Sequence, residues 1–482
     1  MAFRYGDRNQ TNLFPPSLDD LVPDDSPVRV YNAFIDALDL SDLGIVADEN
    51  GVGNPSYDPR AMLKLLVYGY SYGVRSSRKL EREVNYNVSF MWLMGGLKPD
   101  HKTIAEFRRR NKKALRNVLK FCARICIKLD LISGNTLFVD GSKFRANASR
   151  KNMWTARRCE AELNKIDRRI NAILDECDKV DSMESGLPSF VKIQDELKNS
   201  EVLRSKIRSV LDDLETSGKN SVNTVDKDCA FVGRNHYAEP GYNAQLVIDN
   251  ENGLIISNDV VSESNDMGQL SSQLEQAHET MGNQCETVCA DCGYNRPEEL
   301  EKISEQGIKV IVPSIRQAAK PEEREFTKKD FKYDKENNIY ICPQGQILNY
   351  RKSQKSRKSL TYRITSASIC KNCSNWGTCT KDKRGRAIWR MEYEELRNKF
   401  ETEYKKPESQ KVYRLRQQRA EHPFGHIKRN LMADHFLIRG LDGVKAEMSI
   451  LATCFNLRRM MTIVGIALLK EILSGYSTNP AA

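Results

Sequence analysis

One carboxylate stands alone in a run of cationic side chains near the C-terminal end of the chain. The stretch YRLRQQRAEHPFGHIKRN, residues 413–430, contains one acid, Glu421, and five lysines and arginines: Arg414, Arg416, Arg419, Lys428 and Arg429. Helices exposed to water usually carry opposite charges three or four residues apart, because such pairs stabilise the helix slightly. A cationic surface around a single acid instead suits contact with phosphate groups, with the acid kept for a role that a cation cannot perform.

Two further acids are predicted to lie at the ends of strands. Asp140 follows the apolar run LFV and precedes Gly141, while Asp291 follows TVCA and precedes Cys292. The ends of adjacent strands are where open sheets present functional groups. Asp before Gly is also ordinary turn chemistry, and for either acid taken alone this is the simpler interpretation.

Three carboxylates on separate elements, one of them on a basic helix, predict a site for divalent cations. Hydrolysis or transfer at a phosphodiester uses metal ions roughly 3.5–4 Å apart, which stabilise the attacking and the leaving oxygen. Mg²⁺ and Mn²⁺ prefer oxygen ligands, and arginine and lysine can hold the substrate phosphates. The hypothesis is therefore that Asp140, Asp291 and Glu421 bind two Mg²⁺ or Mn²⁺ ions.

A second candidate metal site consists of cysteines. Cys342 in YICPQG is followed by Cys370, Cys373 and Cys379 in ICKNCSNWGTC. A C-x-x-C pair with two further thiols in a small polar segment is typical of a closed tetrahedral zinc site. The lone first cysteine and the five-residue gap before the last are irregular for a zinc ribbon. We expect a structural Zn²⁺ ion here, with free thiols in a basic loop as the alternative.

The elements that must position these residues begin with a helical region. Residues 1–132 carry apolar residues at helical spacing and are predicted to form an N-terminal DNA-binding domain. One of its helices carries a basic cluster that includes Arg108, Arg109 and Arg110. The alternative for this cluster is a solvated cationic face.

The rest of the chain is predicted to be an interrupted α/β core. Residues 133–320 show strand patterns and form its first part, and residues 151–219 within it are predicted to be an inserted antiparallel helical hairpin. That hairpin either packs on itself or mediates dimerisation. Residues 321–388 are polar, basic and cysteine-bearing, and they are predicted to be a zinc-ribbon-like insertion. Residues 389–476 return to a helical pattern and complete the core with the helix of the lone glutamate.

The composition favours a soluble protein with a nucleic-acid partner. The 482 residues suffice for several domains, and 75 lysines and arginines against 65 aspartates and glutamates give an unevenly placed charge of +10. The polar N-terminus lacks the apolar core of a signal peptide, and the longest apolar run, Met460 to Leu469, is too short to cross a bilayer. The 13 scattered cysteines fit reduced thiols. We expect an intracellular protein with no membrane partner.

Together these residues resemble the bacterial insertion-sequence transposases of the DDE superfamily, which have an RNase H-like catalytic domain. The resemblance covers nearly the whole chain, through YDPRAMLKLLVYGY, PDHKTIAEFRRR, FVDGSKFRANAS, GYNAQLVID and ADCGY to a terminal motif. In that motif the family's Tyr, Arg, Glu and Lys match Tyr413, Arg416, Glu421 and Lys428. Four residues separate Arg416 from Glu421, where the commonest family pattern has three.

The resemblance implies an α/β fold, with an RNase H-like mixed sheet flanked by helices, and it implies DNA transposition as the function. The implied catalytic residues are Asp140, Asp291 and Glu421. The implied DNA-binding residues are Tyr413, Arg416 and Lys428, with Arg108, Arg109 and Arg110 of the N-terminal domain. The implied partners are double-stranded DNA, as insertion-sequence ends and as target, and a second copy of the chain, in the cytoplasm at the nucleoid. Two alternatives stay open: an RNase H-like nuclease that cuts without joining, and a catalytically silent DNA-binding descendant of a transposase.

Overall fold

The structure is a computed structural model that describes residues 16–45, 56–181, 189–233, 238–318, 326–354 and 359–476. The chain forms two compact units. Within the described residues, the first unit holds the chain up to Asp266, Ser272–Cys285 and the chain from Gln417 onward. The second unit holds Met267–Ser271 and Glu286–Arg416.

The first unit begins with seven helices among the described residues. They are α1 (Pro27–Asp36), α2 (Leu40–Leu43), α3 (Pro59–Ser71), α4 (Ser77–Tyr86), α5 (Val88–Leu93), α6 (His101–Arg110) and α7 (Lys112–Lys128). Asp58 shows how the sequence sets a helix start, because its carboxylate accepts hydrogen bonds from the N–H groups of Arg60 (2.9 Å) and Ala61 (3.2 Å). Pro59 then supplies the first helical residue of α3.

Antiparallel strands follow these helices. They are β1 (Thr136–Arg145), β4 (Ala230–Val232), β5 (Glu239–Asp249) and β6 (Ile255–Val261). β5 pairs with each of the other three, and its pairing with β1 is continuous from Leu137–Asp249 to Arg145–Gly241. Every residue of β5 after Glu239 is buried. Both faces of this strand are therefore covered, which explains its long run of apolar and amide side chains.

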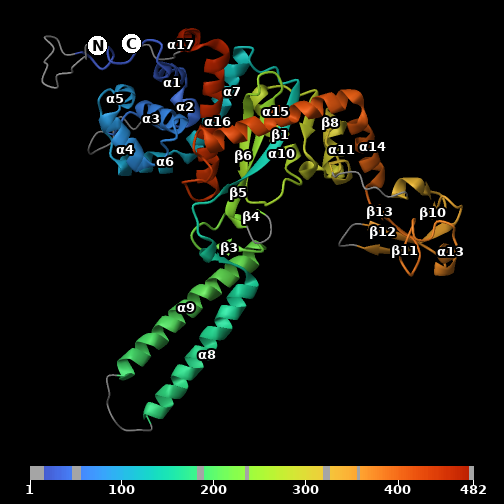
Figure 1. Ribbon diagram of the computed structural model, residues 1–482. Coiled ribbons are helices and arrows are strands. Elements are labelled where there is room, and N and C mark those ends of the chain that lie inside the picture. Colours follow the sequence, from blue (N-terminus) through green and yellow to red (C-terminus); the bar gives the residue numbers. More distant parts are fainter. Residues whose placement is uncertain are drawn as a thin grey trace, which may run out of the picture. The chain divides into compact units, whose positions relative to one another are not determined.

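Two long helices form a hairpin between β1 and β5 in the sequence (Figure 1). They are α8 (Ala156–Asp181) and α9 (Ser189–Ser217), and the short strands at their base are β2 (Met153–Trp154) and β3 (Val222–Asn223). Ion pairs join Arg169 to Glu196 (2.6 Å) and Arg204 to Asp167 (2.8 Å), a register that requires antiparallel helices. The apolar residues of the hairpin pack on one another, including Cys159, Ile166, Ile170, Ile207 and Leu214. The connection between the two helices, residues 182–188, lies outside the described residues.

One buried helix forms the centre of the first unit. The C-terminal helices are α15 (Pro407–Arg429), α16 (Leu441–Val464) and α17 (Ile466–Gly475). α16 is buried along most of its length and packs against α3, α7 and β6. The Asn456 side chain accepts from the N–H of Ile255 and donates to its carbonyl, both at 2.8 Å, so α16 is hydrogen-bonded to β6. Among the described helices, none is by itself long and apolar enough to span a membrane; α16 and α17 reach that length and hydropathy only as a pair bent by 114°.

A buried ion pair ties the N-terminal helices to the segment that follows α15. Arg75, between α3 and α4, lies 2.9 Å from a carboxylate oxygen of Glu447 in α16, and both side chains are almost fully buried. Arg75 also donates to the carbonyls of His435 (2.9 Å) and Met432 (2.7 Å). The second oxygen of Glu447 accepts from the N–H of Leu437 (2.9 Å), and also from the residue after it. The two side chains thereby fix the backbone of residues 432–438.

The second unit combines a parallel strand pair with a small antiparallel sheet. Its first elements are β7 (Thr287–Ala290), the 3₁₀ helix η3 (Cys292–Tyr294), α11 (Pro297–Glu305), β8 (Lys309–Ile311) and α12 (Ile315–Ala318). The antiparallel sheet has the order β13-β12-β11-β10-β9. Its elements are η4 (Lys328–Asp330), β9 (Lys332–Asp334), β10 (Ile339–Ile341), β11 (Ile347–Gln354), β12 (Ser359–Ile364), α13 (Ala367–Lys371) and β13 (Ala387–Met391), and α14 (Glu394–Lys405) then leads into α15.

The predicted class of fold, mixed α/β, is confirmed by these helices and sheets. β5 and β6 lie within residues 133–320, where the sequence shows strand patterns. After β6 the chain continues into α10 (Leu270–Met281), which begins four residues after Asp266. The RNase H-like assignment, the status of the hairpin and of the cysteine-rich sheet as insertions, and the domain boundaries stay predictions.

Candidate active site

Asp140 lies inside β1, not at its end as the sequence suggested. Gly141 does not turn the chain; its backbone is paired with Gln245, and pairing with β5 continues to Arg145. The reason is that a partner strand, more than a hundred residues away, determines where β1 stops, and an Asp-Gly step is compatible with an extended strand. Asp140 is half-buried and belongs to the same face of β1 as Ser142 and Phe144.

A carboxylate from the segment after β6, that of Asp266, packs against the opposite face of β1, and the sequence analysis did not identify it as a site residue. Asp266 accepts hydrogen bonds from the amides of Asn243 (2.7 Å) and Gln245 (2.8 Å), and it lies 3.4 Å from the ammonium of Lys143. A Cβ atom at Gly141 would lie only 2.4 Å from Oδ1 of Asp266. Because Gly141 has no side chain, the carboxylate of Asp266 can pack against β1 at the residue that follows Asp140. The sequence signal was two amides inside an otherwise apolar strand.

Lys428 of α15 is fixed against β1 on the side of Asp140. Its ammonium donates to Oγ of Ser142 (2.6 Å) and to the carbonyl of Lys143 (2.9 Å), and it lies 4.5 Å from the centre of the Phe144 ring. Burial lowers the pKa of Lys428, while the negative charges of Asp434 and Asp140 oppose that shift. The structure thus brings Lys428 within electrostatic reach of Asp140, as expected if both belong to one site.

Glu421 is exposed and lies on the same side of α15 as the residues that contact β1. Phe424, three residues later, packs with its ring centre 6.2 Å from that of Phe144, and Lys428 follows seven residues after Glu421. Pro423 lies inside α15, which nevertheless runs as one helix from Pro407 to Arg429. Burial of Pro423 and the contacts of Phe424 offset the hydrogen bond that proline removes.

The two histidines beside Glu421 have a structural role. The rings of His422 and His426 lie 5.7 and 5.4 Å from the ring of Phe455 in α16. Burial lowers the pKa of both, so the neutral form is favoured. They therefore attach one side of α15 to the central helix.

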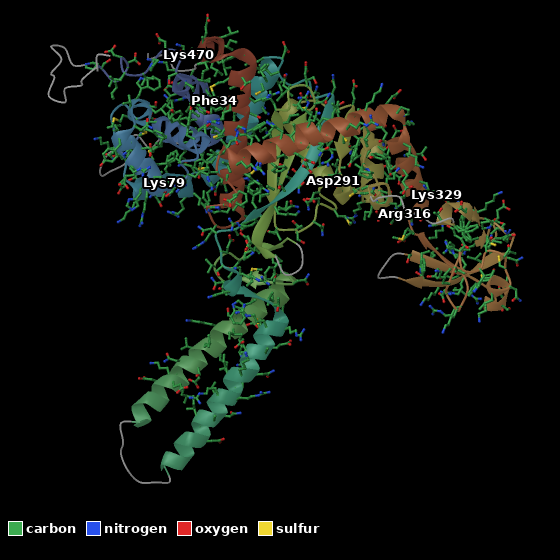
Figure 2. All side chains as sticks on the ribbon, viewed as in Figure 1. Phe34, Lys79, Asp291, Arg316, Lys329 and Lys470 are labelled. Carbon is green, nitrogen blue, oxygen red and sulfur yellow. The ribbon has the colours of Figure 1, made fainter. Side chains whose placement is uncertain are left out.

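The second unit gathers the other predicted active-site residues. Asp291, labelled in Figure 2, follows β7, as predicted. It accepts a hydrogen bond from the N–H of Gly293 (2.8 Å) at the start of η3. The guanidinium of Arg416 lies 5.6 Å from the centre of the Tyr413 ring. Burial raises the pKa of Tyr413 to about 12; the positive charge of Arg416 opposes this shift, while Tyr404, Cys289 and the carboxylate of Asp291 add to it. Asp291, Tyr413 and Arg416 therefore influence one another within this unit.

The carboxylates have the chemistry that a divalent cation requires, but they are not grouped as metal ligands among the described residues. Asp140 and Glu421 provide the oxygen ligands that Mg²⁺ and Mn²⁺ prefer. Across the part of the chain that the structure describes, no three His, Cys, Asp or Glu side chains are grouped closely enough to hold a metal ion. The residue types fit a divalent cation, and the triad stays a prediction.

The four cysteines of the second unit converge on one cavity. Cys342, Cys370, Cys373 and Cys379 all line an apolar cavity of about 40 Å³. The N–H of Gln346 donates to Sγ of Cys342 (3.3 Å), and the N–H of Arg386 donates to Sγ of Cys370 (3.4 Å). Such donors stabilise thiolates. Burial raises the pKa of Cys379, and the other three thiols add to that shift, so all four are close neighbours. The four thiols line one cavity, although they do not form a metal-ligand group among the described residues, and a zinc ion held by them stays a prediction.

The basic cluster of α6 divides into one internal and two exposed arginines. Arg108 donates to the hydroxyl of Tyr70 (3.1 Å), the carbonyl of Arg75 (2.9 Å) and the hydroxyl of Ser77. Arg108 is therefore half-buried and held by groups of α3 and α4 and of the segment between them, and its contact with DNA stays a prediction. Arg109 and Arg110 are exposed and share a carboxylate of the same helix, that of Glu106.

Comparison with known proteins finds two family models along this chain. Residues 16–110 match a model described as "Transposase domain (DUF772)", and residues 341–461 match one described as "Transposase DDE domain". The sequence thus carries similarity to transposase domains at both ends, with residues 111–340 between the matches. The second match includes Glu421 and Lys428, and it leaves Asp140 and Asp291 outside. Comparison with curated proteins gives no match.

Among solved structures, one similar chain is that described as "Cryo-EM structure of piggyBac transposase synaptic complex with hairpin DNA (SNHP)". The comparison covers 95% of this chain and 86% of the other, at 9% sequence identity and a TM-score of 0.27. At this TM-score the likeness does not establish a shared fold.

Proposed function

We propose that the protein is a DNA transposase that binds the ends of its insertion sequence and catalyses metal-dependent strand cleavage and strand transfer. The observation that carries the proposal is the attachment of α15 to β1, which holds Lys428 beside Asp140. The two transposase domain matches support the same function. In this proposal the catalytic core is RNase H-like, and the protein acts as a homodimer on insertion-sequence ends and target DNA, in the cytoplasm at the nucleoid.

The proposed catalytic residues are Asp140, Asp291 and Glu421, which would hold two Mg²⁺ or Mn²⁺ ions. When bound, such ions stabilise the attacking and leaving oxygens of a phosphodiester displacement. The protein holds the proposed ligands in place. Pairing with β5 fixes the backbone of Asp140, and the hydrogen bond from the N–H of Gly293 orients the side chain of Asp291. Glu421 is exposed, so its carboxylate is accessible to metal ions that also contact the DNA.

The proposed phosphate contacts are made by cations that are already held in place. The ammonium of Lys428 has three donors, and two are used on β1, which leaves one for a phosphate oxygen. Tyr413 and Arg416 are proposed to contact the DNA end, with the ring limiting the motion of the guanidinium. Arg108, Arg109 and Arg110 of α6 are proposed to bind the DNA backbone in the N-terminal region, and Arg108 is also held there by its hydrogen bonds to Tyr70 and Arg75.

We also propose a structural Zn²⁺ ion held by Cys342, Cys370, Cys373 and Cys379. The shared cavity and the N–H groups that point at two of the sulfurs support this assignment. A closed site of four thiolates would add folding free energy to the small antiparallel sheet.

The decisive experiment uses the purified full-length chain and DNA duplexes that carry the flanks of its own gene. With Mg²⁺, sequencing of the products should reveal cleavage at the element's ends and joined ends. Asp140→Asn should abolish both while DNA affinity stays nearly unchanged. Asp212→Asn, an equal change at an exposed site of α9, should cleave and join as the parent chain does.

The same products separate the alternatives. Cleavage without joined ends identifies a nuclease. Specific binding of the ends without any cleavage identifies a catalytically silent DNA-binding protein. Retained cleavage by Asp140→Asn removes this residue from the active site.

A further inference from the structure

The back of β1, the face opposite Asp140, carries a polar cluster that the proposed active site does not include. Its members are Lys143 of β1, Asn243 and Gln245 of β5, and Asp266. The two amides are fully buried, and the side chain of Asp266 is only 19% exposed. Around the amides, β5 carries mainly buried apolar side chains. A polar cluster with little access to water therefore lies directly behind the strand of Asp140.

Stability alone does not favour this cluster. Burying a polar or charged side chain costs free energy, and hydrogen bonds inside the protein offset that cost with only a modest net gain. Replacing buried charged pairs by well-packed apolar side chains is often neutral or stabilising. The cluster is also incompletely satisfied, because Oδ1 of Asn243 is buried and has no hydrogen-bond partner among the described residues. Such departures from the local rules of stability are expected where side chains serve function.

The cluster holds the stretch of β1 that directly follows the proposed catalytic aspartate. The carboxylate of Asp266 accepts from both amides of β5 and lies 3.4 Å from the ammonium of Lys143, so it bridges the two strands. It also fills the space that a side chain at Gly141 would need. From the other face, Lys428 donates to Oγ of Ser142 and to the carbonyl of Lys143. The stretch is therefore held from both faces of the sheet.

We propose that Asp266 is a positioning residue, which fixes the part of β1 that carries the carboxylate of Asp140. The inference rests on the proposed function, because it takes Asp140 as a catalytic residue. Asp266 acts through the backbone of β1 and touches neither metal nor DNA. Catalytic groups must be held closely, since a misplacement of about 1 Å can reduce a rate roughly 100-fold. The polar cluster is therefore kept for activity, at no gain in stability.

The first test replaces the cluster by apolar side chains of similar total volume. Asn243→Val/Gln245→Met/Asp266→Ala should have the thermal midpoint of the parent chain or a higher one, because no buried polar group is left without its partner. Lys143 is 30% exposed and can turn to water. Cleavage with Mg²⁺ should nevertheless slow by roughly 10–100-fold, as is typical when the support of a metal ligand is removed. DNA affinity in EDTA should stay unchanged. A merely structural role cannot produce loss of activity at full stability.

The second test needs neither metal nor DNA. Native-state hydrogen exchange of the peptide that covers residues 140–145 should be several times faster in this apolar variant than in the parent chain, because the back of the strand is no longer held. A peptide from α16 should exchange as in the parent chain. Exchange of residues 140–145 at the parent rate contradicts positioning through the backbone.

The matched control is Gln273→Met in α10. Gln273 is another fully buried amide of the first unit, and neither its oxygen nor its nitrogen has a hydrogen-bond partner among the described residues. The same kind of replacement at this position should raise the thermal midpoint and leave cleavage at the parent rate.

Three results overturn the role of Asp266. The apolar variant cleaves at the parent rate, its midpoint falls and the activity follows the folded fraction, or Gln273→Met loses as much cleavage. Failure of the proposed function looks different, because then Asp140→Asn still cleaves or the parent chain does not cleave at all.

Discussion

Replacing Arg75 by methionine should destabilise the folded chain in a way that depends strongly on pH. The substitution keeps an apolar stem but leaves Glu447 buried without its cation, and an uncompensated buried charge typically costs about 3–5 kcal/mol. The carboxyl group avoids most of this by taking up a proton. Burial already raises the pKa of Glu447 in the parent chain, with Arg75 and the N–H groups of Leu437 and Ile438 opposing the shift.

The size and sign of the effect follow from that proton. In the variant, folded Glu447 keeps a proton that the unfolded chain releases above its ordinary pKa of 4.5, so stability falls as pH rises. At about 1.36 kcal/mol per pH unit, this costs roughly 3.4 kcal/mol near pH 7 and roughly 0.7 kcal/mol near pH 5. The two lost hydrogen bonds from Arg75 to backbone carbonyls add about 1 kcal/mol each at both pH values.

The assay is native-state hydrogen exchange of the peptide that covers residues 431–440, corrected for intrinsic rates at each pH. It reports local opening, which suits a chain of two units better than a single unfolding midpoint. Arg60→Met is the matched control, because Arg60 donates to the carbonyls of Ile35 (2.6 Å) and Leu38 (3.0 Å), and its loss should cost the same at both pH values. Arg75→Met/Glu447→Gln should also lose the pH dependence. An equal loss of protection near pH 5 and pH 7 in Arg75→Met would refute this account of the pair.

Three further predictions concern the candidate sites. Gly141→Ala should destabilise the fold by an overpacking cost of about 1–3 kcal/mol, seen as a lower thermal midpoint, and should reduce cleavage, because the new methyl group meets Asp266; unchanged cleavage contradicts this. Lys428→Met should reduce the salt slope of DNA binding in EDTA by about one unit, whereas Glu421→Gln should keep the slope and lose Mg²⁺-dependent cleavage; cleavage by the latter, or a full slope in the former, excludes this division of roles. Elemental analysis should find close to one zinc per chain, and less in Cys373→Ser with a less stable sheet; metal-free protein of equal stability rules out zinc.

The parts of the fold that the sequence predicted are those set by local pattern. Alternating and apolar runs are sufficient to locate β5 and β6, and helical spacing is sufficient to locate the hairpin. The cysteines of the second unit were also identified from spacing alone, since a C-x-x-C pair brings two thiols together whatever surrounds it.

The parts that the sequence could not predict depend on partners far away in the chain. The sequence predicted that Asp140 ends a strand, because Asp-Gly favours turns, but pairing with β5 extends β1 beyond this residue. Asp266 belongs to no motif, and only the folded chain shows that Asn243 and Gln245 bind it. Arg108 is indistinguishable from its two neighbours by composition, although its hydrogen bonds lie inside the protein.

The buried pair of Arg75 and Glu447 also constrains how this chain folds during synthesis. The two residues are 372 positions apart, so at about 5–20 residues per second the ribosome needs roughly 20–75 s to deliver the partner of Arg75. During that interval the apolar sides of α3 and α7 lack α16, the helix that covers them. The apolar surface of α3 and α7 that α16 covers in the folded chain therefore stays exposed until α16 has been made. A chain that ends before α16 lacks this cover, and we expect such a chain to aggregate or to be degraded more readily than one that contains α16.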